Sequence, residues 1–171
     1  VVGSDFIGNS AGTLEGGALW VGAGVAGIPL NMRNCTFAKN RCLDITSTDE
    51  GGAVYIEAQT NHHIENCTFY SNTTAAAGGG ALKIMTLANV FVTNCVFWAN
   101  SSGDGNIIEV VGSLNLAYCD INTNNITGAG TKTIGAGITN AEPYFVDVDN
   151  NDYHLQSMTV RGTFVNALGT W

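Results

Sequence analysis

The stretch at 51–56, Gly-Gly-Ala-Val-Tyr-Ile, and the stretch at 66–72, Asn-Cys-Thr-Phe-Tyr-Ser-Asn, together make one unit of an internal repeat. Gly-Gly-Ala recurs at 16–18 and 79–81, and Phe-x-x-Asn recurs at 6–9, 37–40 and 97–100, with a degenerate copy at 121–124. Successive Phe-x-x-Asn copies begin 31, 32, 28 and 24 residues apart. Such spacing is typical of stacked supersecondary units rather than of a single globular core. The chain is therefore predicted to be a repeat protein.

Each unit contains the alternation expected of β-strands. Val54 and Ile56 share one face of the stretch after Gly-Gly, while Tyr55 points the other way. A second strand follows, with Ile64 on its inner face. The next inward pair, in 67–69, is out of phase with that strand by one residue. A corner must therefore lie between the second and third strands.

The predicted corner residue is an asparagine in three units, since Asn tolerates the left-handed backbone conformation that a one-residue bend needs. These residues are Asn34, Asn66 and Asn94. The pattern predicts an all-β fold, a right-handed parallel β-helix of about five to six coils with three short strands per coil. A sandwich or propeller would show Asn-Gly hairpin turns at regular spacing, and the sequence has none. The 22 glycines argue against a helical fold.

The repeats predict one domain, with β-helix repeats at 1–140 and a C-terminal closing coil at 141–171. Two inward columns run along the predicted axis, namely Cys35, Cys67, Cys95 and Cys119 beside Phe37, Phe69 and Phe97. A disulfide ladder or a metal site would need converging side chains, but stacked Cβ vectors are parallel. We therefore expect buried thiols that act as small hydrophobic groups. Cys42 lies outside the column and is expected at the surface.

Composition excludes two classes of partner. Six Lys and Arg residues face 14 Asp and Glu residues for a net charge of −8, so binding to nucleic acid or to an anionic membrane is not expected. No apolar stretch approaches the roughly 20 residues of a membrane-spanning segment. The chain begins at Val1 without an initiator Met or a leader, as a processed protein or a fragment would. Low Lys content with abundant Asn, Thr and Gly favours a secreted or cell-surface location.

The alternation of Gly-Gly-Ala-[Leu/Val] with Phe-x-x-Asn over residues 3–124 resembles the repeat of the polymorphic outer-membrane proteins and related bacterial right-handed β-helix proteins. The segment 142–155, which contains Glu-Pro-Tyr-Phe-Val-Asp, resembles the segment that closes many secreted bacterial β-helix domains. This resemblance implies a passenger domain exposed on the cell surface and concerned with adhesion or surface structure.

Two stretches are candidate ligand sites. Trp20 and Tyr55 are expected to stack on the outer surface, where they would form a platform for sugar rings or simply a stabilising aromatic ladder. The run at 147–152 concentrates oxygen ligands that suit Ca²⁺, although such runs also make plain turns; the candidate ligands are Asp147, Asp149, Asn151 and Asp152. No cofactor is otherwise required.

Asn-x-Ser/Thr sequons provide candidate glycosylation sites. The sequons outside the corners lie at Asn72, Asn100 and Asn125, in or near predicted loops.

No catalytic constellation is recognisable, so the chain is not expected to be an enzyme. No outward column holds two carboxylates on neighbouring coils, as paired acid–base chemistry would need. Lys83 beside Glu109 and Arg33 beside Glu65 are expected to be surface ion pairs, each contributing less than about 1 kcal/mol.

These observations predict an extracellular or cell-surface structural or adhesive module. Both ends of the predicted β-helix are nearly uncapped, so head-to-tail assembly into a filament is expected, with another copy of the chain or a host-surface glycan or protein as partner. The alternative function is a carbohydrate-binding or carbohydrate-cleaving β-helix with a pectin-lyase-like fold.

Overall fold

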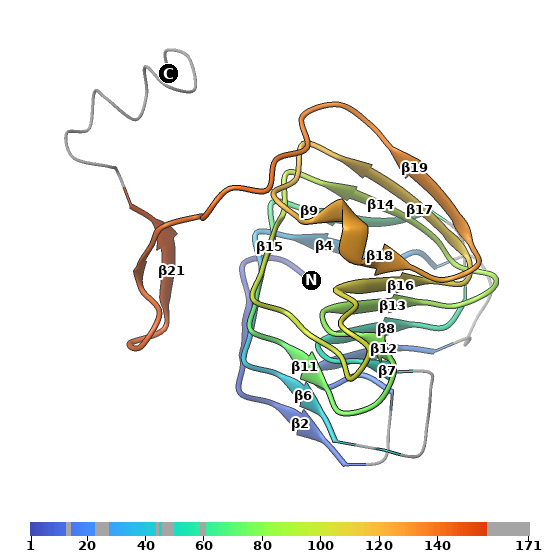
Figure 1. The fold of residues 1–171 in the computed structure, drawn as a ribbon, viewed down its shortest axis with the longest axis horizontal. Helices are drawn as coiled ribbons and strands as arrows, with labels where there is room; N and C mark the ends of the chain where they lie inside the picture. The colour runs from blue at the N-terminus through green and yellow to red at the C-terminus, as the bar shows by residue number, and fades with distance from the viewer. Residues whose placement is uncertain (13–14, 23–27, 44, 46–49, 59–60, 157–171) are drawn as a thin grey trace. The chain divides into compact units, whose positions relative to one another are not determined.

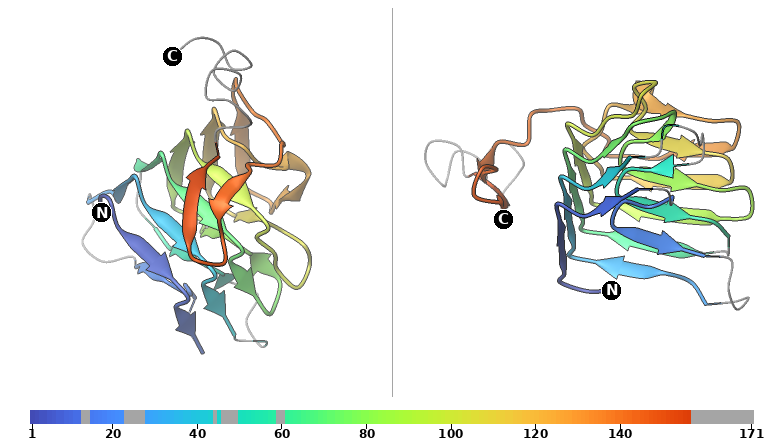
Figure 2. Two further views of the ribbon diagram at one scale, coloured as in Figure 1. Left: turned by 90° about the vertical axis from the view of Figure 1, so that its left-hand side faces the viewer. Right: turned by 90° about the horizontal axis from the view of Figure 1, so that it is seen from below.

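The computed structural model describes the whole chain except residues 13–14, 23–27, 44, 46–49, 59–60 and 157–171. Two compact units are present, Val1–Ala141 and Glu142–Trp171. The first unit is a parallel β-helix, and Figure 2 shows its coils stacked side by side. None of the described helices is long and apolar enough to cross a bilayer, in agreement with the sequence.

Three parallel sheets run along the axis of the solenoid (Figure 1). The first sheet contains β1 (Asp5–Ile7), β5 (Thr36–Ala38), β10 (Thr68–Tyr70) and β15 (Val96–Trp98). The second contains β3 (Leu19–Val21), β8 (Val54–Ile56), β13 (Leu82–Ile84), β16 (Ile108–Val110) and β18 (Ile126–Thr127). The third contains β4 (Asn31–Arg33), β9 (His62–Glu65), β14 (Asn89–Thr93), β17 (Ser113–Ala117) and β19 (Thr131–Ile134). These are the three strands per coil that the alternation predicts.

Two narrower ladders add to the three predicted sheets. β2 (Ser10–Ala11), β6 (Arg41–Cys42) and β11 (Thr73–Thr74) form one, and β7 (Glu50–Gly51) pairs with β12 (Gly78–Gly79) in the other. The second ladder explains the repeated glycine pairs. A Cβ atom on Gly52 would lie 1.9 Å from the carbonyl oxygen of Gly80 on the next coil, so only glycine fits there.

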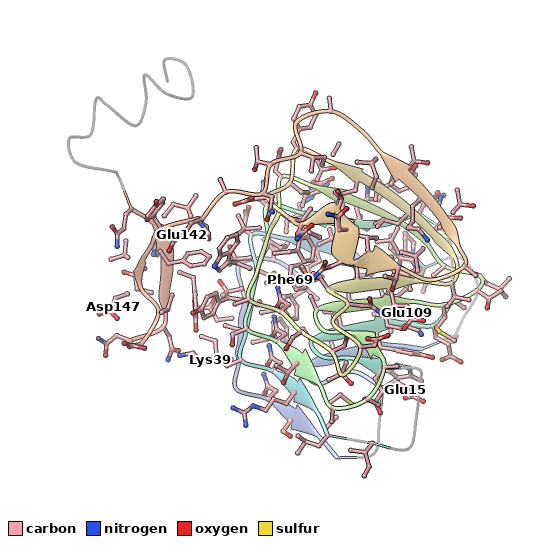
Figure 3. The ribbon with its side chains drawn as sticks, in the orientation of Figure 1. Glu15, Lys39, Phe69, Glu109, Glu142 and Asp147 are labelled. Carbon is pink, nitrogen blue, oxygen red and sulfur yellow. The ribbon has the colours of Figure 1, made fainter. Side chains whose placement is uncertain are left out.

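The predicted register is confirmed. Val54 pairs with Leu82, and Phe69 pairs with Phe97 and Phe37 on its two sides. The ring centroid of Phe69 lies 5.1 Å from that of Phe37 and 4.6 Å from that of Phe97, with nearly parallel ring planes. Figure 3 shows Phe69 inside the solenoid. All three phenylalanines are buried in one continuous core that also contains the cysteine column.

The predicted corners are also confirmed. Asn34, Asn66 and Asn94 have φ values of 54°, 54° and 55°, and Tyr118 takes the same conformation in the degenerate copy. The backbone turns through the left-handed region again just after the Phe strand, at Lys39, Ser71 and Ala99. This second corner was not predicted because its residues share no side-chain type.

The number of coils is smaller than predicted. The two longest sheets have five strands each, and the solenoid makes about four turns rather than five to six coils. The prediction assigned 141–171 to a closing coil of the same domain. In the structure, β20 (Phe145–Asp147) instead pairs antiparallel with β21 (Asp152–Leu155), a hairpin within the second unit. Residues 157–171 of that predicted coil lie outside the described residues.

Phe69→Ala should destabilise the solenoid by about 3 to 5 kcal/mol, because it opens a cavity between two stacked rings that cannot close without shifting a coil. Urea unfolding followed by circular dichroism measures the loss. Tyr70→Ala is the matched control, since Tyr70 is the next residue of β10 and is only half-buried. Equal effects of the two substitutions would contradict the stacked core.

Candidate functional site

A ladder of buried asparagine side chains runs parallel to the phenylalanine stack. Asn40 donates from its backbone N–H and from Nδ2 to Oδ1 of Asn72, at 3.0 and 2.9 Å. Asn72 donates in the same way to Oδ1 of Asn100, at 2.9 and 2.8 Å, and Asn9 donates to Asn40. Each of the three accepting residues also donates from Nδ2 to the carbonyl of a phenylalanine one coil back, Phe6, Phe37 or Phe69. The last residue of Phe-x-x-Asn thus links three successive coils.

This ladder corrects the glycosylation prediction. An N-linked glycan is attached through the Asn amide nitrogen, but the Nδ2 atoms of Asn72 and Asn100 donate hydrogen bonds inside the solenoid. The two side chains are 0% and 6% exposed, so the folded chain has no room for a glycan at either position. Asn125 is half-buried and donates to the carbonyl of Gly105 at 3.1 Å. Asn125 stays a predicted glycosylation site.

The cysteine column consists of free, buried thiols, as predicted. The backbone N–H of Cys67 donates to Sγ of Cys95, and that of Cys95 donates to Sγ of Cys119, each at 3.4 Å. Burial raises the pKa of the Cys95 thiol well above its ordinary value, so this sulfur stays protonated and unreactive at neutral pH.

Cys42 is buried as well, which corrects the prediction that it lies at the surface. It belongs to β6, where it pairs with Ala11 on one side and with Thr74 on the other. The residues after Asn40 therefore form a short strand, in which the Cys42 side chain is buried and the Arg41 side chain is exposed. No alternation of side chains indicates this strand, because the strand is only two residues long.

The expected aromatic platform of Trp20 and Tyr55 does not form. The two residues pair across β3 and β8, as predicted, and Trp20 is 56% exposed. Tyr55, however, is only 5% exposed, so its ring is not available to a ligand. The outward side of a strand is solvent-exposed only where no connection covers it, and strand alternation carries no information about such cover.

The same outward column contains Lys83 and Glu109, whose Nζ and Oε2 atoms lie 2.7 Å apart. The pair forms as predicted, but it is not a surface pair, because the Lys83 side chain is 1% exposed. Removing one partner of a buried ion pair costs about 3 to 5 kcal/mol, far more than a solvated pair. The second predicted pair, Arg33 with Glu65 at 2.8 Å, is solvent-exposed as expected.

The candidate calcium ligands lie in the turn between β20 and β21. The Asp147 carboxylate accepts hydrogen bonds from the backbone and side chain of Asn150, and these bonds lower its pKa. Asp152 accepts from the backbone N–H of His154 and contacts its ring. Asp147 thus caps the turn, Asp152 is engaged with His154 within β21, and within the described ranges no three His, Cys, Asp or Glu side chains converge on a metal position. Calcium binding stays a prediction, and Asp149 and Asn151 belong to the same turn.

A pocket opens where the repeat loses its regular form. It has a volume of about 310 Å³ and lies in the first unit; its walls are Phe97, Trp98, Ala99, Ile107, Asn122, Asn125 and Asn140. After Ile121 the chain makes a short 3₁₀ helix, η1 (Thr123–Asn125), and enters β18 directly (Figure 1). The last coil therefore lacks the two narrow ladders, and the pocket occupies the side where they are missing.

The pocket was not predicted from the sequence, although two features of the sequence mark its position. Tyr70 and Trp98 follow the phenylalanine at the same position of successive repeats and pair across β10 and β15. The distance between successive repeats also decreases, from 28 to 24 residues, at the degenerate copy. Asn124 was expected to continue the Phe-x-x-Asn series there. In the structure Asn124 is exposed in η1 and is not a rung of the ladder.

A family model described as a right-handed β-helix region matches residues 16–165. This match supports the β-helix part of the predicted resemblance, but it does not confirm the polymorphic outer-membrane protein repeat. No curated protein and no solved structure matches the chain.

All five thiols should resist iodoacetamide in the native protein and react fully after unfolding in denaturant, because each is buried. Intact-mass spectrometry counts the modified groups. Selective alkylation of Cys42 under native conditions would contradict its place in β6.

Asn72→Asp should destabilise the protein by about 2 to 5 kcal/mol, because the isosteric carboxylate cannot donate to the buried Phe37 carbonyl and places a buried negative charge beside Oδ1 of Asn100, which keeps only its bond from the backbone N–H of residue 72. Denaturant unfolding at neutral pH measures the change. Asn124→Asp is the matched control, since Asn124 is exposed in η1. A loss below about 0.5 kcal/mol for Asn72→Asp would show that the ladder is not a major source of stability.

Proposed function

This chain belongs to the right-handed β-helix family, and we propose that it is a non-catalytic structural or adhesive module, secreted or exposed at a cell surface, that binds a neutral ligand. The observation that carries the proposal is the chemistry of the pocket. Its seven wall residues are aromatic, aliphatic or amide residues, and none of them is titratable.

A neutral pocket favours binding over catalysis. General acid–base catalysis needs a side chain that gains or loses a proton near the operating pH, and none of the pocket walls can do so. Asp120, which lies two residues before the wall residue Asn122, accepts hydrogen bonds from Thr139 and from the backbone of Ala141. Amide groups, in contrast, offer both a donor and an acceptor to a ligand. We therefore propose no carbohydrate-cleaving activity.

The proposed extracellular location is compatible with the burial of the cysteines. An oxidising environment converts accessible thiols into disulfides or higher oxidation states. Every cysteine of this chain is nonetheless buried, so an oxidant in solution has little access to the thiols of the folded chain. The resemblance to cell-surface passenger domains supports the same location.

Binding to a glycan and protein array tests the proposal. The purified chain should bind a defined subset of the array without cleaving it, and Trp98→Ala should weaken binding by about tenfold or more, because it removes an aromatic wall of the pocket. Trp20→Ala is the control, since Trp20 is exposed outside the pocket. Cleavage of an array component would overturn the proposal, and so would binding that Trp20→Ala reduces and Trp98→Ala does not.

A further inference from the structure

The upper end of the solenoid, formed by β18 and β19, is an open strand edge. β19 pairs with β17 on one side, and within the described residues no strand lies on its other side (Figure 1). All four residues of β19 are exposed. An open edge of this kind is a template for a strand of another chain. The side chains at the upper end therefore decide whether a second copy can stack on it.

A lysine occupies the core position of this edge. The inward column of the third sheet runs upward through His62, Val90, Leu114 and Lys132. The three lower residues are 0% exposed. Two of them are aliphatic, and the ring nitrogens of His62 both lie within hydrogen-bond distance of backbone groups. Lys132 therefore brings a positive charge to a column that is otherwise apolar or fully hydrogen-bonded.

The corner between the second and third sheets normally passes its carbonyl groups to the coil above. The Val110 carbonyl accepts from the backbone N–H of Gly130 at 2.8 Å, and the Gly112 carbonyl accepts from that of Thr131 at 2.9 Å. Continuing the register of β16 with β18 by one residue places Gly128 above Val110, and continuing that of β17 with β19 places Gly130 above Gly112. The carbonyls of Gly128 and Gly130 are therefore the acceptors that a further coil would use.

The Lys132 side chain occupies these two acceptors. Its ammonium group donates to the carbonyl oxygens of Gly128 and Gly130, and also to that of Thr127. Three acceptors match the three N–H donors of an ammonium group. A single side chain of the last coil thus makes the hydrogen bonds that the backbone of a further coil would otherwise make.

We propose that Lys132 closes the upper end of the solenoid against a second copy of this chain. A docking coil would have to displace the ammonium group from its carbonyls and cover the positive charge with apolar core residues, and a buried charge without a partner is strongly disfavoured. Inward-pointing charged side chains protect sheet edges in this way. Head-to-tail stacking into a filament, which the sequence predicts, is therefore not expected at this end.

Without this lysine the upper end would be open to self-association. Ile134, the other inward residue of β19, pairs with Leu116 and is 44% exposed. A leucine at position 132 would join it and extend the apolar column above Leu114. An apolar surface beside unpaired backbone groups favours pairing with a strand of another molecule. Replacing the charge should therefore convert the upper end into a contact surface.

Sedimentation velocity of the full chain over a range of concentrations, with and without Lys132→Leu, tests this proposal. The variant should self-associate at a concentration about tenfold or more below that of the unmodified chain. Hydrogen exchange should show new protection of the backbone amides of residues 131–134 in the associated state. Circular dichroism verifies folding, and leucine suits the position because Leu114 occupies it one coil below.

Thr133→Leu is the matched control, because Thr133 pairs with Asn115 on the opposite, outward side of the same strand, and this variant should associate like the unmodified chain. Lys132→Gln removes the charge with a smaller change in shape, should also associate more readily, and carries the test if Lys132→Leu does not fold. A folded Lys132 variant that associates no more readily than the unmodified chain would overturn the proposal. Equal association of Thr133→Leu and Lys132→Leu, or association without protection of residues 131–134, would overturn it as well.

Discussion

The buried asparagine ladder is the interaction on which the rest of this structure depends. Each rung places two N–H donors on the amide oxygen of the next coil and a third on the carbonyl of the previous one, so a coil cannot slip in register without leaving several buried polar groups unpaired. The corner residues and the phenylalanine stack lie beside this ladder and position it. The left-handed residues at 39, 71 and 99 turn the chain into each rung, and the stacked phenylalanines fill the interior beside it.

Much of the fold could be predicted because its periodic features are local. The alternation around Val54 identifies the inward face of a strand, and the phase shift before Cys67 requires a corner whose position Asn66 then supplies. Each inference needs only a few neighbouring residues, and the repetition multiplies the signal. The same reasoning fails for outward side chains, because their exposure depends on connections that vary between repeats. Tyr55 and Lys83 are buried, although both lie on the outward side of their strands.

The errors in the candidate site have a related cause. Asn72 carries a sequon, and the sequon alone could not reveal that its amide nitrogen is already engaged inside the solenoid. The pocket was missed because it arises from an irregularity, and periodic reasoning treats the degenerate copy at 121–124 as a weaker version of the same unit. The structure shows instead that this copy has changed its conformation to η1. In this solenoid the regular coils supply rigidity, and the loss of regularity supplies a concave, amide-lined surface.

The most direct test of this account is the hydrogen exchange of the asparagine side-chain amides, measured by NMR on the folded chain. We expect the Nδ2 protons of Asn40 and Asn72 to be strongly protected. One Nδ2 proton of Asn100 should exchange much faster than theirs, because it has no acceptor among the described residues. Exchange of the Asn72 amide as rapid as that of exposed Asn124 would contradict the ladder as the element that holds the coils in register.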